Sequence, residues 1–186
     1  GRNLVGAFRK FQEAGRLEII TTAATHAVLP LLADHPPSLR AQILVARDHY
    51  RSCFGCDPRG IWLPECAYTE AVDVALREAG LIWFILDTHG LLYARPRPRY
   101  SVFAPVITLS GLAAFGRDLE SARQVWSQHE GYPGDPNYRD FYRDVGWDLP
   151  IEELQRVYPD GQRRFTGLKC HRITGSEPKQ RYDRAA

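Results

Sequence analysis

The chain has 186 residues, of which 44% are hydrophobic and 25% are charged, and its formal net charge is +2. Such a composition is typical of a globular domain that buries a core without disulfides or a metal, and it excludes disordered, collagen-like and coiled-coil proteins. The balanced charge gives no indication of a nucleic-acid partner, and the longest strongly apolar run, residues 80–86, is too short for a membrane helix, so we expect neither partner.

The first half of the chain alternates between short apolar runs and helical patterns. Strands are predicted over residues 17–21, 60–64 and 81–86, and helices over residues 8–14, 38–50 and 70–79. Thr69 is positioned to cap the third helix. The strand over residues 81–86 is continuously apolar, which indicates burial on both faces. The β-α-β-α-β order predicts an α/β fold with a parallel sheet and crossover helices.

The second half of the chain is more irregular. A helix is predicted from Asp118 to Glu130, and the turn residues of segment 131–137 predict a loop. Two further short helices are predicted over residues 138–145 and 151–157, and the polar segment 176–186 is expected to be a loose tail.

The cysteines are Cys53, Cys56, Cys66 and Cys170. The spacing of Cys53 and Cys56 fits half a zinc site or a redox pair, but the other two cysteines do not form a second matched pair. Turn residues, rather than a helix, follow Cys56. We expect no metal and reduced thiols in a cytoplasmic protein, and the role of Cys53 and Cys56 stays open.

The chain lacks methionine, even at position 1, and no signal-peptide pattern opens it. It is therefore expected to be either a trimmed mature chain or an internal piece of a longer protein.

Reactive side chains follow all three predicted strands. The first strand leads to His26, the second to Glu65, and the third to Asp87 and His89. Because function in parallel α/β folds lies where strands end, these residues are predicted to gather in one site.

Glu65 is flanked by the aromatic residues Trp62 and Tyr68. Aromatic rings pack on the apolar face of a sugar, and a carboxylate attacks its anomeric centre, so the three fit a sugar-cleaving site. The alternative is that Glu65 caps the helix near Thr69 or pairs with an arginine. His26, His89 and Trp62 also have plain structural alternatives, the two histidines as hydrogen-bonded structural residues and Trp62 as a core residue.

Segment 62–68, WLPECAY, resembles the nucleophile motif of glycoside hydrolase family 57. Segments 15–20, 25–26 and 29–30 resemble the motif that precedes it in that family. Further segments resemble the branching-enzyme members in particular: DTHG at 87–90, FGRD at 115–118, QVWS at 124–127 and EGYPG at 130–134. The resemblance extends from about residue 6 to residue 175, so residues 1–175 are assigned to a partial catalytic barrel and residues 176–186 to the tail.

The resemblance implies an incomplete seven-stranded (β/α) barrel and a retaining 1,4-α-glucan branching activity. Glu65 would be the nucleophile, and the 6-hydroxyl of an acceptor α-1,4-glucan, amylose-like or glycogen-like, would take up the transferred chain. Neither a metal nor an organic cofactor is implied, and the oligomeric state is left open. The expected sugar-binding residues are His26, Trp62, Tyr68, His89 and Tyr132. Tyr132 lies in a loop that either closes over the site or is a plain surface loop.

Two family motifs have no match. The family's first histidine motif is not found before Gly15, and its general acid, an aspartate in an aromatic-rich motif, is not found downstream. We therefore expect an internal piece of a larger enzyme and leave open whether these residues act alone. The alternatives to a branching enzyme are a family 57 amylase, a 4-α-glucanotransferase or a glucan-binding fragment without turnover.

Overall fold

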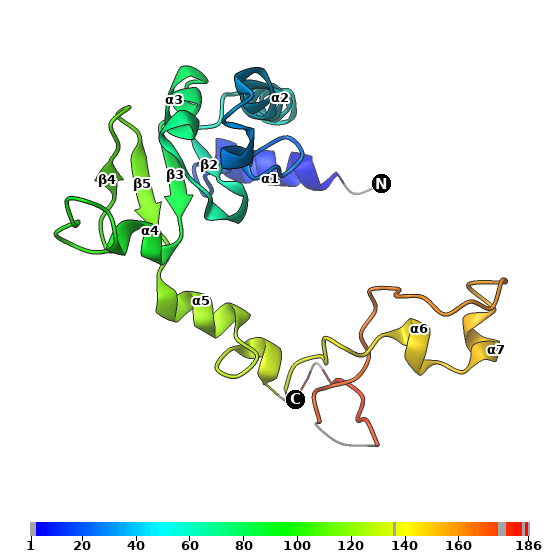
Figure 1. Ribbon diagram of the computed structural model, residues 1–186. Coiled ribbons are helices and arrows are strands. Elements are labelled where there is room, and N and C mark those ends of the chain that lie inside the picture. The colour runs from blue at the N-terminus through cyan, green and yellow to red at the C-terminus, as the bar shows by residue number, and fades with distance from the viewer. Residues whose placement is uncertain (1–2, 136, 175–177, 184, 186) are drawn as a thin grey trace. The chain divides into compact units, whose positions relative to one another are not determined.

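The computed structural model describes residues 3–135, 137–174, 178–183 and 185, and it divides the chain into two compact units (Figure 1). The first unit is Gly1–Asp118 and the second is Leu119–Ala186. Of the expected tail, residues 178–183 and 185 are described, and residues 176, 177, 184 and 186 lie outside the described residues.

The first unit contains a five-stranded sheet with the order β1-β2-β3-β5-β4 (Figure 1). The strands are β1 (Thr21–Thr22), β2 (Gly60–Trp62), β3 (Trp83–Leu86), β4 (Val106–Ile107) and β5 (Ala113–Gly116). The first three strands and β5 run parallel, and β4 pairs antiparallel with β5. The predicted α/β fold with a parallel sheet is confirmed. The first strand lies later than the predicted segment 17–21, and β4 and β5 were not predicted.

Four α-helices accompany this sheet in the described part of the unit. They are α1 (Leu4–Glu13), α2 (Pro36–Phe54), α3 (Glu70–Glu78) and α4 (Thr88–Leu92). The longest, α2, begins before the predicted residue 38 because proline fits the first turn of a helix and the His35 side chain accepts a hydrogen bond from the Ser38 amide. It ends at Gly55, which adopts a left-handed conformation with φ 75°.

Helices α2 and α3 supply the core that packs against the sheet. The buried side chains include Leu39 and Ile43 of α2, Val72 and Leu76 of α3, and Ile61 and Phe84 of the strands. In β3, Phe84 and Leu86 are buried, whereas Trp83 and Ile85 are only partly buried. The prediction that this strand is buried on both faces is therefore wrong. Successive strand residues point to opposite faces, and the buried cluster holds only the alternate ones, Phe84 and Leu86.

In its described residues, the second unit contains three short helices and a 3₁₀ turn. They are α5 (Leu119–Trp126), η3 (Tyr132–Gly134), α6 (Val145–Asp148) and α7 (Ile151–Leu154). The helix predicted over residues 138–145 is wrong. Its backbone pairs with a later segment instead, because the Asp140 amide donates to the His171 carbonyl at 2.8 Å and the Val145 amide donates to the Leu168 carbonyl at 3.0 Å.

Asp144 organises the second unit from a fully buried position. Its carboxylate accepts hydrogen bonds from the amides of Gly146 (2.9 Å), Thr166 (2.9 Å) and Gly167 (3.0 Å), and from the Thr166 hydroxyl (2.9 Å). Lys169 Nζ lies 3.5 Å away. Burial acts to raise the pKa of Asp144, but the hydrogen bonds outweigh it and hold that pKa below its usual value. The carboxylate thus joins α6 to residues 166–169.

None of the helices in the described segments is long and apolar enough to cross a bilayer.

Candidate active site

The carboxyl ends of the parallel strands place reactive side chains along one edge of the sheet. His26 follows β1, Glu65 follows β2, Asp87 and His89 follow β3, and Arg117 follows β5. The strand ends that the sequence singled out therefore lie at the same edge, and β5 adds a cation that was not nominated.

Glu65 lies in a short 3₁₀ turn, η2 (Pro64–Cys66), in which the backbone adopts an unusual conformation. Glu65 has φ 55° and Cys66 has φ 53°, both in the left-handed region, which costs a non-glycine residue about 1–2 kcal/mol. Buried Leu63 and Pro64 anchor the turn from one side. As a result, the Glu65 side chain projects outward and is 72% exposed.

His26 is the nearest titratable partner of Glu65. Its Nε2 atom lies 3.4 Å from Glu65 Oε1, and its Nδ1 atom lies 3.5 Å from the Thr22 hydroxyl. The same hydroxyl donates to the Trp62 carbonyl at 3.0 Å. Glu65 therefore pairs with a histidine rather than an arginine. It does not cap α3, whose N-cap residue is Thr69, although the Thr69 side chain makes no capping hydrogen bond.

His89 and Glu65 line the same open cleft of about 740 Å³. Asp87 caps α4 by accepting a hydrogen bond from the Thr88 amide at 2.8 Å, and its other oxygen lies 3.3 Å from His89 Nδ1. One member of each histidine–carboxylate pair, Glu65 after β2 and His89 after β3, thus lines the cleft.

The two aromatic residues beside Glu65 have different surroundings. Tyr68 is part of the cleft wall, and its ring stacks on Phe84 with centroids 5.2 Å apart. Burial raises the pKa of Tyr68 to about 12, so its phenol stays protonated at neutral pH. Trp62 is partly buried, and the Arg117 guanidinium lies 5.7 Å from the centre of its ring.

Tyr132 belongs to the second unit, where it begins the turn η3. It is half exposed, and its ring lies 5.4 Å from that of Tyr138. The structure therefore describes Tyr132 within its own unit, and its relation to Glu65 stays a prediction.

Arg117 is the residue that the sequence interpretation missed as part of the site. It lies in the quoted segment 115–118, but the strand before it is too short to be predicted from a pattern. Its backbone amide donates to the Leu86 carbonyl at 2.9 Å, and its carbonyl accepts from the Thr88 hydroxyl at 2.7 Å. A strand assigned over residues 113–116 would have identified it.

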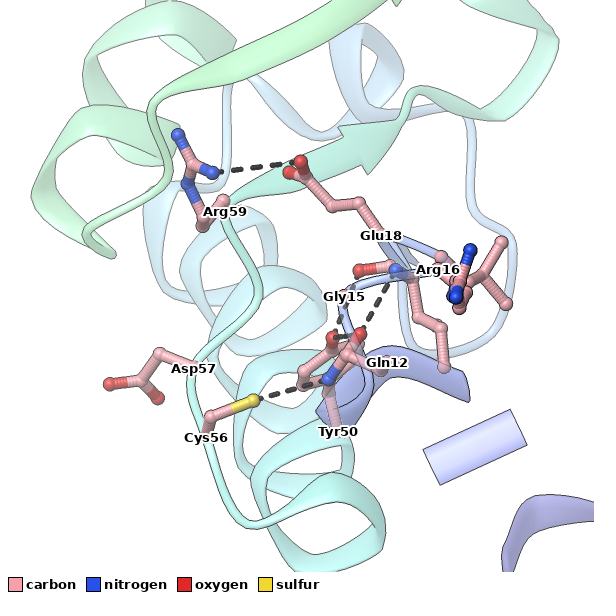
Figure 2. Close-up of a pocket in the computed structure, with 10 residues that line it drawn as sticks. Gln12, Gly15, Arg16, Glu18, Tyr50, Cys56, Asp57 and Arg59 are labelled. Atoms are coloured by element: carbon pink, nitrogen blue, oxygen red, sulfur yellow. Dashed lines mark hydrogen bonds and ion pairs between the residues drawn. The ribbon is translucent and has the colours of Figure 1, made fainter. Parts of the chain in front are cut away.

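A second hollow, of about 510 Å³, lies among the residues that precede β1 and β2 (Figure 2). Its polar groups bond to one another. The Tyr50 hydroxyl donates to Gln12 Oε1 at 2.9 Å, Gln12 Nε2 donates to Cys56 Sγ at 3.3 Å, and Arg59 lies 3.6 Å from Glu18 (Figure 2). This hollow is separate from the edge that carries Glu65. The hydrogen bonds of Tyr50 to Gln12 and to the Ile19 carbonyl, in its wall, join α2 to α1 and to the chain before β1.

Among the described residues, no group of three or more histidine, cysteine, aspartate and glutamate side chains is arranged to hold a metal ion. The four cysteines are free thiols.

Comparison with known proteins gives consistent matches. The family model described as glycosyl hydrolase family 57 matches residues 1–181. The chain is 36% identical over 170 residues to a 1,4-alpha-glucan branching enzyme of Thermococcus kodakarensis, covering 76% of this chain and 25% of that protein.

Two solved structures are also similar. The alpha-amylase AmyC from Thermotoga maritima is 44% identical with a TM-score of 0.84, covering 97% of this chain and 36% of that chain. The GH57-type branching enzyme from Pyrococcus horikoshii is 32% identical with a TM-score of 0.74, covering 97% of this chain and 32% of that chain. The chain thus spans about a quarter to a third of the length of these relatives.

Proposed function

The chain belongs to glycosyl hydrolase family 57 and has the α/β fold of part of that family's seven-stranded barrel, and from this premise we propose that it acts on α-glucan with Glu65 as the nucleophile. The observation that carries the proposal is the left-handed turn after β2. It presents an exposed carboxylate in a cleft at the carboxyl edge of the sheet, with His26 Nε2 at 3.4 Å.

The proposed reaction has two steps. A Glu65 oxygen attacks the anomeric carbon, the glycosidic C–O bond breaks, and a general acid protonates the leaving oxygen. An acceptor hydroxyl then attacks the same carbon, gives its proton to the conjugate base of that acid, and releases Glu65 as a carboxylate. Retaining enzymes hold the two carboxyl groups about 5 Å apart. We assign the acid to no residue of this chain, and no metal or organic cofactor enters the scheme.

We assign the sugar contacts to residues around the same edge. His26 and His89 would bond sugar hydroxyls, and Trp62 and Tyr68 would present apolar surface to the ring. Tyr132 would exclude water when its loop covers the site, which favours transfer to a glucan over hydrolysis.

Branching is the activity that we propose, with the 6-hydroxyl of a second α-1,4-glucan as acceptor. The relatives from Thermococcus kodakarensis and Pyrococcus horikoshii, both described as branching enzymes, support it. Such an enzyme would serve glycogen-type synthesis in the cytoplasm. Hydrolysis is the second candidate, because the similar structure with 44% identity is described as an alpha-amylase.

Covalent trapping tests the nucleophile. A 5-fluoro α-glycosyl fluoride built on maltose carries fluoride as its leaving group, which departs without a strong general acid, so the test does not depend on where the acid lies. We expect the intact mass to rise by one glycosyl unit and peptide mapping to place it on Glu65. Glu65→Gln should reduce the labelling rate at least 100-fold, whereas Glu70→Gln, which changes an exposed carboxylate of α3, should leave it within twofold. Labelling at another residue would contradict the assignment.

Product analysis separates the candidate activities. When the chain is incubated with amylose, proton NMR should show new α-1,6 anomeric signals without a matching rise in reducing ends. Reducing ends alone would indicate the amylase. With neither product, an altered chain-length distribution of the amylose would indicate a 4-α-glucanotransferase, and glucan binding with an unaltered distribution would indicate a binding module; the branching proposal would be wrong in both cases.

A further inference from the structure

The pair of Glu65 and His26 is formed by two left-handed residues that follow neighbouring strands. Glu65 follows β2 with φ 55°, and His26 follows β1 with φ 56°. The two strands run parallel, and Thr22 pairs with Trp62 at their ends. In this arrangement His26 Nε2 lies 3.4 Å from Glu65 Oε1. Left-handed backbone is unfavourable for both residue types, so each turn has to be held by its surroundings.

Gln42, a residue of α2, holds the turn that carries His26. Its side chain makes two hydrogen bonds to Thr25, the residue before His26. Oε1 accepts from the Thr25 amide at 3.0 Å, and Nε2 donates to the Thr25 hydroxyl at 2.9 Å. The Gln42 carbonyl also accepts from the Ala24 amide at 3.0 Å. These hydrogen bonds fix the backbone of the two residues that precede His26.

The position of the His26 ring depends on this turn. The His26 amide donates to the carbonyl of Ala23, a core residue, at 3.0 Å. The ring itself is 53% exposed, so apolar packing holds it only weakly. Its polar neighbours are the Thr22 hydroxyl, 3.5 Å from Nδ1, and Glu65. Gln42 therefore acts on the pair through the backbone of His26.

We propose that Gln42 is a positioning residue that holds His26 beside Glu65. The proposal rests on the proposed functions of Glu65 and His26. With Nε2 at 3.4 Å from the attacking carboxylate, His26 reaches the sugar beside the anomeric carbon, where hydrogen bonds to the 2-hydroxyl strengthen in the transition state. Loss of the Gln42 amide should therefore lower the rate of the covalent step more than the affinity for the ligand.

Trapping kinetics test the positioning role. With the 5-fluoro α-maltosyl fluoride, Gln42→Met should lower the maximal labelling rate of Glu65 at least fivefold, while the half-saturating concentration changes less than threefold. Gln42→Glu should recover most of the rate, because its carboxylate can accept from both the amide and the hydroxyl of Thr25. A loss of less than fivefold in Gln42→Met would overturn the proposal.

Gln12→Met is the matched control. Gln12 makes the same kinds of contact in the second hollow, where Oε1 accepts from the Ile19 amide at 3.0 Å and Nε2 donates to Cys56 Sγ at 3.3 Å (Figure 2). Both substitutions should lower the urea midpoint, but Gln12→Met should label Glu65 within twofold of the wild-type rate. An equal loss of labelling in Gln12→Met and Gln42→Met would indicate general destabilisation and would overturn the proposal.

A double-mutant cycle tests whether Gln42 acts through His26. His26→Ala should itself slow labelling, and the addition of Gln42→Met should then slow it less than twofold further, since the two changes remove one contact. Losses that multiply would contradict the route through His26. Thr25→Val covers the case in which Gln42→Met folds poorly. It removes only the bond to Gln42 Nε2, so it should give a smaller loss that disappears in the His26→Ala background.

An NMR comparison reports on the position of His26 without any glycosyl chemistry. Glu65→Gln removes the charge that faces the ring at 3.4 Å, so at matched pH it should shift the Cε1–H signal of His26. The shift should be similar in the wild-type and Gln12→Met backgrounds and less than half as large in the Gln42→Met background. The signal is assigned by its absence in His26→Ala.

The two readouts separate the positioning role from the function of Glu65. The proposal requires both the slower labelling and the smaller NMR shift in Gln42→Met, and either result alone overturns it. If wild type does not label at all, the proposed function of Glu65 is wrong, and the NMR comparison still decides whether Gln42 holds His26 beside Glu65. If wild type labels and Gln42→Met labels equally fast, only the positioning role is wrong.

Discussion

The buried side chain of Asp144 joins segments of the second unit through hydrogen bonds rather than through apolar packing. Its two oxygens accept four hydrogen bonds from three residues and face the ammonium group of Lys169 at 3.5 Å. These bonds are stronger to the ionised carboxylate than to the protonated acid, because a charged acceptor forms shorter and stronger hydrogen bonds. The second unit should therefore depend on pH through this residue.

The direction of that dependence follows from the lowered pKa of Asp144. An ordinary aspartate has a pKa of 3.8, and the hydrogen bonds from Thr166, Gly146 and Gly167 hold the folded value below it against the opposing effect of burial. The stabilisation is complete well above pH 3.8 and decreases as the pH falls from there toward the folded pKa.

We predict that Asp144→Asn lowers the urea midpoint at pH 6 and makes it less sensitive to acid. The amide keeps the shape of the carboxylate but loses its charge and one acceptor. Urea titrations at pH 6 and pH 3 measure the effect, with Asp34→Asn, a change of an exposed aspartate, as the control. An equal loss between the two pH values in wild type and Asp144→Asn would contradict the assignment.

Helix α3 illustrates how a single element divides its residues between the core and the solvent. Leu76 is fully buried, whereas Val74, two positions earlier, is 50% exposed. The same helix buries Asp73, whose carboxylate accepts hydrogen bonds from the Thr108 hydroxyl at 2.9 Å and the Ser110 amide at 3.2 Å. Thus α3 packs against the core of the sheet through Leu76 and forms hydrogen bonds with the turn between β4 and β5 through Asp73.

The two faces of α3 give a matched pair of variants. We predict that Leu76→Ala lowers the free energy of unfolding by about 2–5 kcal/mol, because it leaves a cavity in the core. Val74→Ala should change it by no more than about 0.5 kcal/mol. Urea denaturation measures both, and similar losses in the two variants would show that α3 does not pack as described.

The sequence predicted the elements whose patterns are local. Residues 70–79 show the helical period between Thr69 and Gly80, and the segment is a helix nearly as predicted. Strands β4 and β5 were not predicted because they have only two and four residues, which is too short for a recognisable pattern. Their pairing also depends on distant contacts such as that of Asp73 with Thr108. The helix predicted over residues 138–145 is wrong for the same reason, a distant contact: the backbone of this segment forms hydrogen bonds with residues 168–173.

The part of the site that depends on local sequence patterns could also be predicted. The strand-end rule located Glu65, His26 and His89 at one edge without any contact being known. It could not show that Glu65 has φ 55° or that Arg117 reaches Trp62, because a left-handed turn and a cross-strand contact have no local pattern in this sequence.

At the scale of the whole chain, the two units differ in how much apolar surface they bury. The first contains the buried cluster of α2, α3 and the sheet. In the described part of the second, Leu154 is buried, while many large side chains stay exposed. Those more than 70% exposed are Trp126, Phe141, Tyr142 and Phe165.

We predict that a protease cleaves the second unit before it cleaves the core of the first. Brief chymotrypsin digestion should cut first after the exposed aromatic residues of the second unit and within the segment 93–105, where Tyr93 and Phe103 are exposed. The segment from α2 to β3 should be protected, because its opening requires disruption of the core. Intact-mass analysis of the time course measures the order, and early cuts within α2 or α3 would contradict it.

The left-handed turn after β2 restricts which residues evolution or a designed library can place at position 66. Asparagine, aspartate and glycine tolerate a φ of 53°, whereas valine, isoleucine and threonine do not, since their branched side chains collide with the backbone there. The backbone conformation at position 66 therefore limits which residues are tolerated there, independently of catalysis. A library randomised at this position should retain mainly small or short polar residues.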